Sequence, residues 1–242
     1  MSELLHPRYW PSWLAVGLVR ALGLLPLPVL WGLGTCIGRI AYWFAGSRRG
    51  VARRNMEICL SDRSDRDREA LLKQSFGWLG VAALSQGIGW GISRTRLRRL
   101  VKMRNVKVID DCFEQGRPVI LLVPHFVGVD LAGLAFAGLQ RPGVCMYQKI
   151  RDPVIDRQVR RSRTRFGSLL VERNDDLRRL IREIRKGEPL FYLPDQNANR
   201  RTGIFVPFCG FPASTVPMLG RFAEMTGAAV VPLIPRYLPR GH

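Results

Sequence analysis

Short apolar runs alternate with helical patterns over the C-terminal half of the chain. Runs of four to six mainly apolar residues are typical of parallel strands that are buried on both faces. They occupy residues 119–123, 144–147, 168–171, 190–193 and 229–234. Helical patterns lie between them at 131–139, 153–165 and 175–186. This alternation predicts βαβ units and an α/β fold in which helices flank a mainly parallel sheet.

The N-terminal stretch has a different pattern, because it is apolar over a much longer range. Only two charged residues lie between positions 9 and 47. Pro26 and Pro28 stand near the middle of this stretch, and prolines interrupt a straight helix. We therefore predict two helical pieces, over 12–25 and 29–45.

The same stretch suggests contact with a membrane. Its uncharged run, residues 21–38, is close to the length of about 18 residues at which a segment becomes a spanning candidate. Arginine pairs follow at 48–49 and 53–54, and such a flank favours the cytoplasmic side. We expect residues 1–47 to associate with the membrane, spanning or half-inserted, and 48–242 to form a cytoplasmic domain docked on anionic inner-leaflet lipids. The alternative is a pair of core helices in a soluble protein.

Composition narrows the class of protein and of partner. The chain has 242 residues, 47% of them hydrophobic, which excludes an intrinsically disordered chain. Lys and Arg total 38 against 19 Asp and Glu, a formal charge of +19. Such a balance predicts an anionic partner: nucleic acid, an anionic membrane face or a phosphorylated substrate. The five cysteines show no paired spacing, so we expect neither a zinc site nor a disulfide framework. We also expect no metal and no cofactor.

One histidine occupies a position that is typical of catalytic residues. Of the three histidines only His125 is far from a terminus, and it follows the apolar run 119–123 directly. Ligand and catalytic groups gather at the carboxyl ends of parallel strands. Asp130 comes one helical turn later, so its carboxylate can accept the imidazole N–H and fix the tautomer. No serine or cysteine motif stands beside this pair, which predicts that His125 is a general base for a substrate hydroxyl.

Several further motifs carry a resemblance over almost the whole chain. With the His-x4-Asp pattern, the chain resembles the bacterial lipid A biosynthesis lauroyl/myristoyl acyltransferases, within the lysophospholipid acyltransferase superfamily. His-x4-Asp alone is a weak signal, whereas the ordered set is specific. The set comprises Val51-Ala-Arg-Arg-Asn55, Arg151-Asp-Pro-Val154, Ser162-Arg-Thr-Arg-Phe-Gly167, Phe191-Tyr-Leu-Pro-Asp-Gln196, Phe205-Val-Pro-Phe-Cys-Gly210 and Gly227-Ala-Ala-Val-Val-Pro232.

The resemblance implies a glycerolipid acyltransferase-like fold and a reaction in lipopolysaccharide biosynthesis. An acyl chain on acyl carrier protein is transferred to a hydroxyl of a phosphorylated, Kdo-bearing lipid A precursor at the cytoplasmic face of the bacterial inner membrane. By motif, His125 is the base and Asp130 its orienter. Arg163 matches the arginine of a Gly-Arg pair and Asp195 the first aspartate of a Pro-Asp-x-Asp segment, both substrate-binding.

Arginines near Arg163 extend the predicted substrate site. Arg151 and Arg165 are available to hold phosphates of the acceptor, because guanidinium groups bind phosphate in a bidentate manner. The chain departs from the family pattern at Ser162, where glycine is usual, and at Gln196-Asn197, where the second aspartate is missing. It ends at His242, where relatives continue, so we expect C-terminal elements of the domain to be absent.

Two other readings remain open from the residues. A glycerolipid or phosphatidylinositol-mannoside acyltransferase shares the same His-x4-Asp chemistry. A non-catalytic basic protein that binds membrane or nucleic acid would also explain the charge. No nucleic-acid-binding motif occurs in the sequence, so we expect no nucleic-acid partner.

Overall fold

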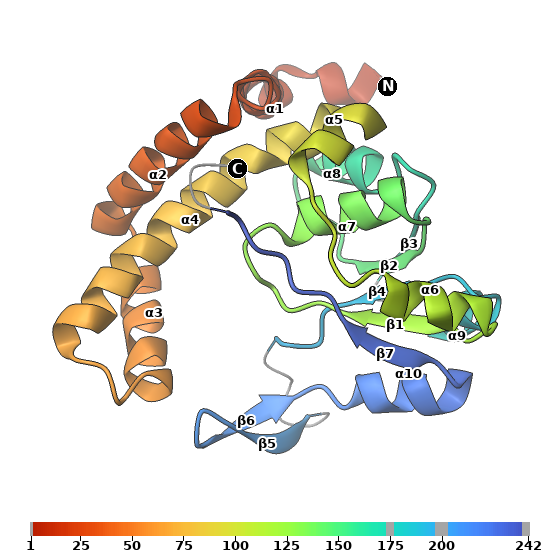
Figure 1. The fold of residues 1–242 in the computed structure, drawn as a ribbon. Helices are drawn as coiled ribbons and strands as arrows, with labels where there is room; N and C mark the ends of the chain where they lie inside the picture. The colour runs from red at the N-terminus through yellow and green to blue at the C-terminus, as the bar shows by residue number, and fades with distance from the viewer. Residues whose placement is uncertain (1, 173–176, 197–202, 239–242) are drawn as a thin grey trace.

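A five-stranded parallel sheet forms the centre of the molecule (Figure 1). The computed structural model describes residues 2–172, 177–196 and 203–238. The strands run in the order β3-β2-β4-β1-β7 and every pairing is parallel. Their bounds are β1 (Val119–Leu122), β2 (Val144–Tyr147), β3 (Leu169–Glu172), β4 (Leu190–Tyr192) and β7 (Ala229–Pro232). The prediction of an α/β fold with a mainly parallel sheet is confirmed, and each predicted strand is present.

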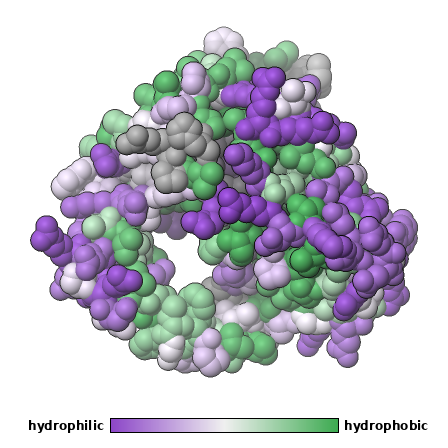
Figure 2. Space-filling view, in the orientation of Figure 1, coloured by the Kyte–Doolittle hydropathy of each residue, from purple (hydrophilic) through white to green (hydrophobic). Residues whose placement is uncertain are grey.

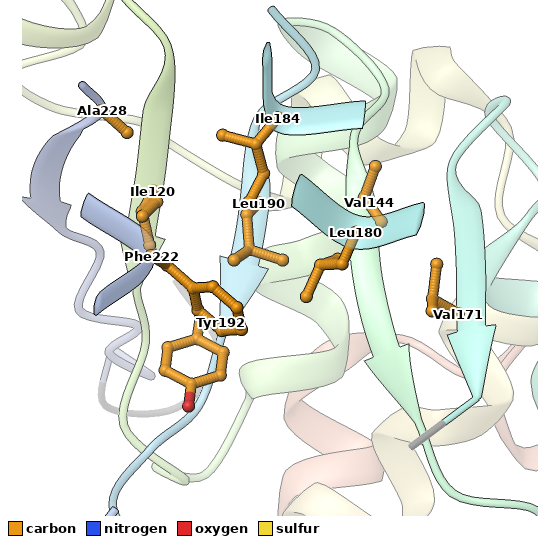
Figure 3. Close-up of a cluster of buried hydrophobic side chains, with 9 residues drawn as sticks. All are labelled: Ile120, Val144, Val171, Leu180, Ile184, Leu190, Tyr192, Phe222 and Ala228. Atoms are coloured by element: carbon orange, nitrogen blue, oxygen red, sulfur yellow. The ribbon is translucent and has the colours of Figure 1, made fainter. Parts of the chain in front are cut away.

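Helices cover both faces of the sheet. They are α6 (Lys107–Glu114), α7 (Val129–Leu139), α8 (Pro153–Arg163), α9 (Leu177–Arg185) and α10 (Met218–Thr226). Successive residues of a strand point to opposite faces, so each strand contributes to two cores. Ile120 packs with Leu180 of α9 and Phe222 of α10 (Figure 3), whereas Leu121 packs on the other face with Phe136 of α7. Burial on both faces explains why the strand sequences are apolar throughout.

A helical arm precedes the sheet and curves along one side of it (Figure 1). After two short 3-10 turns, η1 (Ser2–Leu5) and η2 (Pro7–Tyr9), the N-terminal helices follow in chain order. They are α1 (Trp10–Leu22), α2 (Leu27–Phe44), α3 (Gly46–Cys59), α4 (Asp65–Gly91) and α5 (Arg94–Leu100). The two predicted apolar helices are confirmed, each starting about two residues early. Pro26 caps α2 and Pro28 lies in its first turn, where a missing N–H is tolerated.

Backbone-to-backbone contact joins α2 to α4. The buried face of α2 repeats every four residues and includes Gly34 and Gly38. A Cβ at Gly38 would clash with the carbonyl oxygen of Phe76, and one at Gly80 with that of Gly34. The absence of side chains therefore lets the two helices approach closely. Within the described residues, no helix is both long enough and apolar enough to cross a membrane.

No helix or strand was predicted between Asp195 and α10, where the structure has an antiparallel hairpin. Among the strands that the structure describes, β5 (Ile204–Phe208) and β6 (Phe211–Thr215) pair only with each other, antiparallel. Cys209 and Gly210 form its two-residue turn with φ of 51° and 78°, the positive values that a tight hairpin requires. Figure 2 shows an opening through the molecule that this hairpin, the helical arm and the sheet region surround.

Candidate active site

His125 lies in the loop after β1 and is held by residues that follow the neighbouring strand β4. Its ring Nδ1 is 2.5 Å from Oδ1 of Asp195, and its backbone N–H donates to Oδ2 of the same carboxylate at 2.7 Å. The side-chain amide of Gln196 lies 3.2 Å from Nε2. Because β1 and β4 pair in parallel, their carboxyl ends meet and bring these loops together.

These contacts define the protonation pattern of the imidazole. Burial alone would raise the pKa of the Asp195 carboxyl, but hydrogen bonds from the backbone and ring of His125 outweigh it and lower that pKa. The carboxylate is therefore ionised at neutral pH and only accepts hydrogen bonds. Nδ1 consequently carries the proton and donates to Asp195. In the neutral imidazole the lone pair then lies on Nε2, the nitrogen that faces the side-chain amide of Gln196.

Asp130 does not occupy the position that the sequence predicted. Its Oδ1 accepts from Arg163, at 3.1 Å from Nε and 2.7 Å from Nη2, and its Oδ2 accepts from Gln86 at 3.0 Å. Between these described residues, no hydrogen bond joins Asp130 to the ring of His125. The reason is the start of α7: Gly128, in the left-handed region at φ 89°, turns the chain so that Asp130 in the first turn faces α8 and α4. A guanidinium there offers two charge-assisted hydrogen bonds.

The residues around His125 line a cavity of about 640 Å³ at the carboxyl ends of the central strands. Its polar members include His125, Asp130 and Arg163. Most of the remaining wall is apolar, and the volume lies in the range of about 300–1,000 Å³ typical of small-molecule sites. The apolar lining includes Leu121, Leu134, Phe136, Ala137, Val144, Met146, Phe191, Val216, Met218 and Phe222.

A thiol also lines this cavity, yet it is not a nucleophile at neutral pH. Burial raises the pKa of Cys145 to about 11, although the nearby charge of Arg163 opposes the effect. The thiolate is the reactive form of cysteine, so this group stays protonated and inert. The sequence-based expectation that the substrate supplies the nucleophile is consistent with this environment.

A smaller hollow of about 210 Å³ lies on the α4 side of the same loop. His125 and Asp130 line it as well as the large cavity, together with Gln86 and Gly128. The ring of Tyr237 closes over Gly128, with ring atoms 3.4 Å from where a Cβ would stand. A side chain at position 128 would therefore meet both a positive φ and an aromatic ring.

The other predicted substrate-binding arginines lie outside the cavity lining. Arg151 is exposed in the loop before α8, and Arg165 follows α8, where it donates to the carbonyl of Gly91 at 3.5 Å. Of the arginines predicted to bind substrate, the structure brings only Arg163 to His125. Asn197, the second residue that departs from the family pattern, lies outside the described residues.

Gln86 was not predicted, and Asp195 was predicted to bind substrate rather than to contact His125. Gln86 lies 44 positions before its partner Asp130, on a helix with no chemical motif. Its only signal is an amide, beside Ser85, in the largely apolar C-terminal half of that helix. Asp195 had been singled out by resemblance as a substrate contact, and the strand order that places it on His125 could not be read from one sequence.

Known proteins match this chain over most of its length. The model of the bacterial lipid A biosynthesis acyltransferases matches residues 1–242. The lipid A biosynthesis lauroyltransferase of Escherichia coli K12 is 33% identical over 241 residues, which are 99% of this chain and 78% of that protein. The palmitoleoyltransferase of the same strain is 32% identical over 206 residues, 85% of this chain and 67% of that protein.

A third relative gives the same result. The lipid A biosynthesis myristoyltransferase of Escherichia coli K12 is 31% identical over 243 residues, covering 98% of this chain and 73% of that protein. The family resemblance drawn from the motifs is confirmed, as is the expectation of an acyltransferase rather than a non-catalytic basic protein. The chain belongs to the bacterial lipid A biosynthesis acyltransferase family.

Proposed function

We propose that this acyltransferase moves a fatty acyl chain from acyl carrier protein to a hydroxyl of a Kdo-bearing lipid A precursor. The observation that carries the proposal is the position of His125 at the mouth of an apolar cavity, with Asp195 on one ring nitrogen and a basic lone pair on the other. An apolar cavity accepts an acyl chain, and a base beside it serves a hydroxyl nucleophile.

The reaction follows from this geometry as a single displacement. Nε2 of His125 takes the proton of the acceptor hydroxyl, whose oxygen attacks the thioester carbonyl and forms a tetrahedral oxyanion. The carbon–sulfur bond then breaks, and the imidazolium returns its proton to the departing thiolate. Asp195 holds the ring and stabilises the imidazolium between these steps. The acceptor hydroxyl replaces the amide of Gln196 at Nε2.

Arg163 is our candidate for the charge that stabilises the oxyanion. Its guanidinium lines the cavity and is held by Asp130, which Gln86 holds in turn. A fixed donor aimed at developing charge lowers a barrier without reorganisation during the reaction. In this proposal Asp130 acts through Arg163 in the structure as it stands, and Asp195 is the carboxylate that orients the base.

The surface of the arm supports a membrane location. The outer face of α2 exposes Leu33, Ile37 and Ile40, among other apolar side chains, while its inner face packs on α4. A helix that is apolar all round requires apolar surroundings on both sides. We propose that residues 1–47 rest in the inner membrane and that 48–242 act at its cytoplasmic face.

Positive charge supports the choice of partners. A formal charge of +19 favours an acidic carrier protein, phosphorylated glycolipid and anionic inner-membrane lipids alike. Arg151 and Arg165, both exposed, are proposed contacts for acceptor phosphates outside the cavity.

An acyl transfer assay on the purified full chain tests the proposal. Donors are acyl carrier proteins loaded with defined chains, with acyl coenzyme A as the matched alternative. Acceptors are a Kdo-bearing lipid A precursor, its Kdo-free form and a lysophospholipid. We expect product with the first donor class and the first acceptor. Preference for the lysophospholipid, or equal use of the Kdo-free form, would contradict the acceptor assignment.

A further inference from the structure

The β5–β6 hairpin exposes apolar side chains in a segment without charge. No charged residue occurs between Arg201 and Arg221, although charged residues make up 24% of the chain. Its largest side chains are half or more exposed: Ile204 50%, Phe205 62%, Phe208 64% and Phe211 55%. Exposed apolar groups that cluster in this way mark a binding surface. Figure 2 shows the apolar edge below the opening, where β5 and β6 lie in Figure 1.

Both faces of the hairpin are apolar near its turn. In the strand register Phe208 stands opposite Phe211, and Phe205 stands opposite Ser214. Because successive side chains alternate between faces, Phe208 and Phe211 share one face and Phe205 lies on the other. A hairpin that docks on a protein surface needs only one apolar face. Two apolar faces instead fit surroundings that are apolar on every side, as in lipid.

The chain on either side of the hairpin also lines the large cavity. Gln196 precedes it and Val216 follows it, and both line that cavity. A two-stranded hairpin is marginally stable in water by itself, so its surroundings decide whether it is held in place. Anything that binds the turn of the hairpin therefore also positions the entrance to the cavity.

Helix α3, which lies beside the hairpin turn, supplies positive charge next to the apolar side chains. The thiol of Cys209 in the turn lies beside that of Cys59 at the end of α3, and this neighbour, together with burial, raises the pKa of Cys59. Helix α3 carries arginines at 48, 49, 53 and 54, and its acidic residue is Glu57. An apolar tip beside a cationic helix matches the depth profile of an anionic leaflet, whose phosphates lie outside its acyl chains.

We propose that the β5–β6 hairpin inserts its phenylalanine-bearing turn into an anionic lipid leaflet and holds the cavity mouth at the surface where a glycolipid acceptor lies. The proposal rests on the proposed function in one respect, that the acceptor is embedded in a membrane. It adds a lipid contact separate from residues 1–47.

The exposed Cys209 provides a probe at the tip. In a full chain in which Cys36, Cys59, Cys112 and Cys145 are alanine, Cys209 is labelled with an environment-sensitive fluorophore. The matched control is Val108→Cys in a chain that also lacks Cys209, because Val108 is 54% exposed on α6, away from the hairpin. Both are mixed with vesicles of phosphatidylethanolamine and phosphatidylglycerol.

We expect the emission from position 209 to shift to shorter wavelength and to be quenched by a nitroxide on the lipid chains, while position 108 stays open to aqueous iodide. If the chain sediments with the vesicles and position 209 remains open to iodide, the hairpin proposal is overturned and the proposed membrane location stands. If the chain does not bind the vesicles, both are overturned.

Activity gives an independent readout. The double variant Phe208→Ser, Phe211→Ser should raise KM for a vesicle-embedded acceptor about tenfold or more, with little change for the same acceptor in detergent. Val108→Ser is the matched control. A selective rise in KM for acyl carrier protein would overturn the proposal in favour of a protein partner. The Cys209 probe decides the question even where the double variant folds poorly.

Discussion

Two carboxylates hold the polar residues of the cavity, Asp195 on His125 and Asp130 on Arg163, and they lie on scaffolds of different kinds. Asp195 and its partner His125 lie on loops that follow strands, with side chains 39% and 40% exposed. Asp130 and Arg163 lie on helices α7 and α8, 30% and 34% exposed, and Gln86 on α4 braces them. Loops tolerate the small movements that admit an acceptor hydroxyl, whereas helices fix a guanidinium in place. Asp195 therefore supports the reacting group, His125, whereas Asp130 supports the fixed charge of Arg163.

Removing the base should have the largest effect on this arrangement. His125→Ala should lower kcat by about 10²–10⁴-fold, the usual contribution of a positioned acid–base group. His6→Ala is the matched control, because His6 is exposed at the N-terminus and should keep the parental rate. Initial rates of acyl transfer at saturating donor measure both variants. A parental rate for His125→Ala would exclude the proposed mechanism.

Replacing each aspartate by asparagine should distinguish the His125–Asp195 pair from the Asp130–Arg163 pair. Asp195→Asn should lower kcat by about 10–150-fold with little change in Tm, since a hydrogen bond to a charged group contributes about 1.5–3 kcal/mol. Asp130→Asn should mainly lower Tm, with a smaller loss of kcat, because Arg163, the proposed oxyanion donor, loses its ionic partner. Thermal melts and steady-state kinetics on both variants give the comparison. The reverse pattern would assign the orienting role to Asp130, as the sequence motif predicted.

Removing the N-cap of α8 should have the smallest effect, and it should affect only the helices that carry Asp130 and Arg163. Asp152 caps α8 through the N–H groups of Val154 and Ile155 and accepts from Ser12 on α1. Asp152→Ala should lower the free energy of unfolding by about 0.5–2 kcal/mol, the usual value of an N-cap, while Asp152→Asn should retain most of it.

The effect of Asp152 also has a defined pH dependence. The hydrogen bond from Ser12 lowers the pKa of this carboxyl against the opposing effect of burial. A lowered folded-state pKa stabilises the protein above the ordinary carboxyl value of about 3.9, and the gain is lost as pH falls through the folded value. The difference in Tm between the parent and Asp152→Ala should therefore shrink below about pH 4. A difference that stays constant down to pH 3 would contradict this account.

Elements were predictable from sequence where a pattern repeats over their whole length. The strand that ends before His125 and the long apolar helices are examples, because each is defined by local periodicity. The β5–β6 hairpin was not predicted, since Pro207 and Pro212 interrupt any strand pattern. Both prolines are accommodated because the hairpin pairs with no other strand in the described part of the chain.

The candidate site was predictable in its members and not in its pairing. His125, Asp130, Arg163 and Asp195 meet at one cavity mouth or on its loops, as the motifs suggested. Which carboxylate meets which cation depends on the turn at Gly128 and on the order of strands in the sheet. Both are tertiary properties, so the spacing of one motif could not decide between them.

The place of β1 in the sheet bears on the order in which the molecule assembles during synthesis. The strand that carries His125 pairs with β4 on one side and with β7, near the end of the chain, on the other. The helices of the arm, by contrast, are complete by Leu100, and its α2 and α4 are joined by contacts between segments that lie closer in the sequence. Contacts that join nearby segments form early, and those that join distant ones form late. The ribosome therefore releases the arm well before β7 emerges and completes the surroundings of His125.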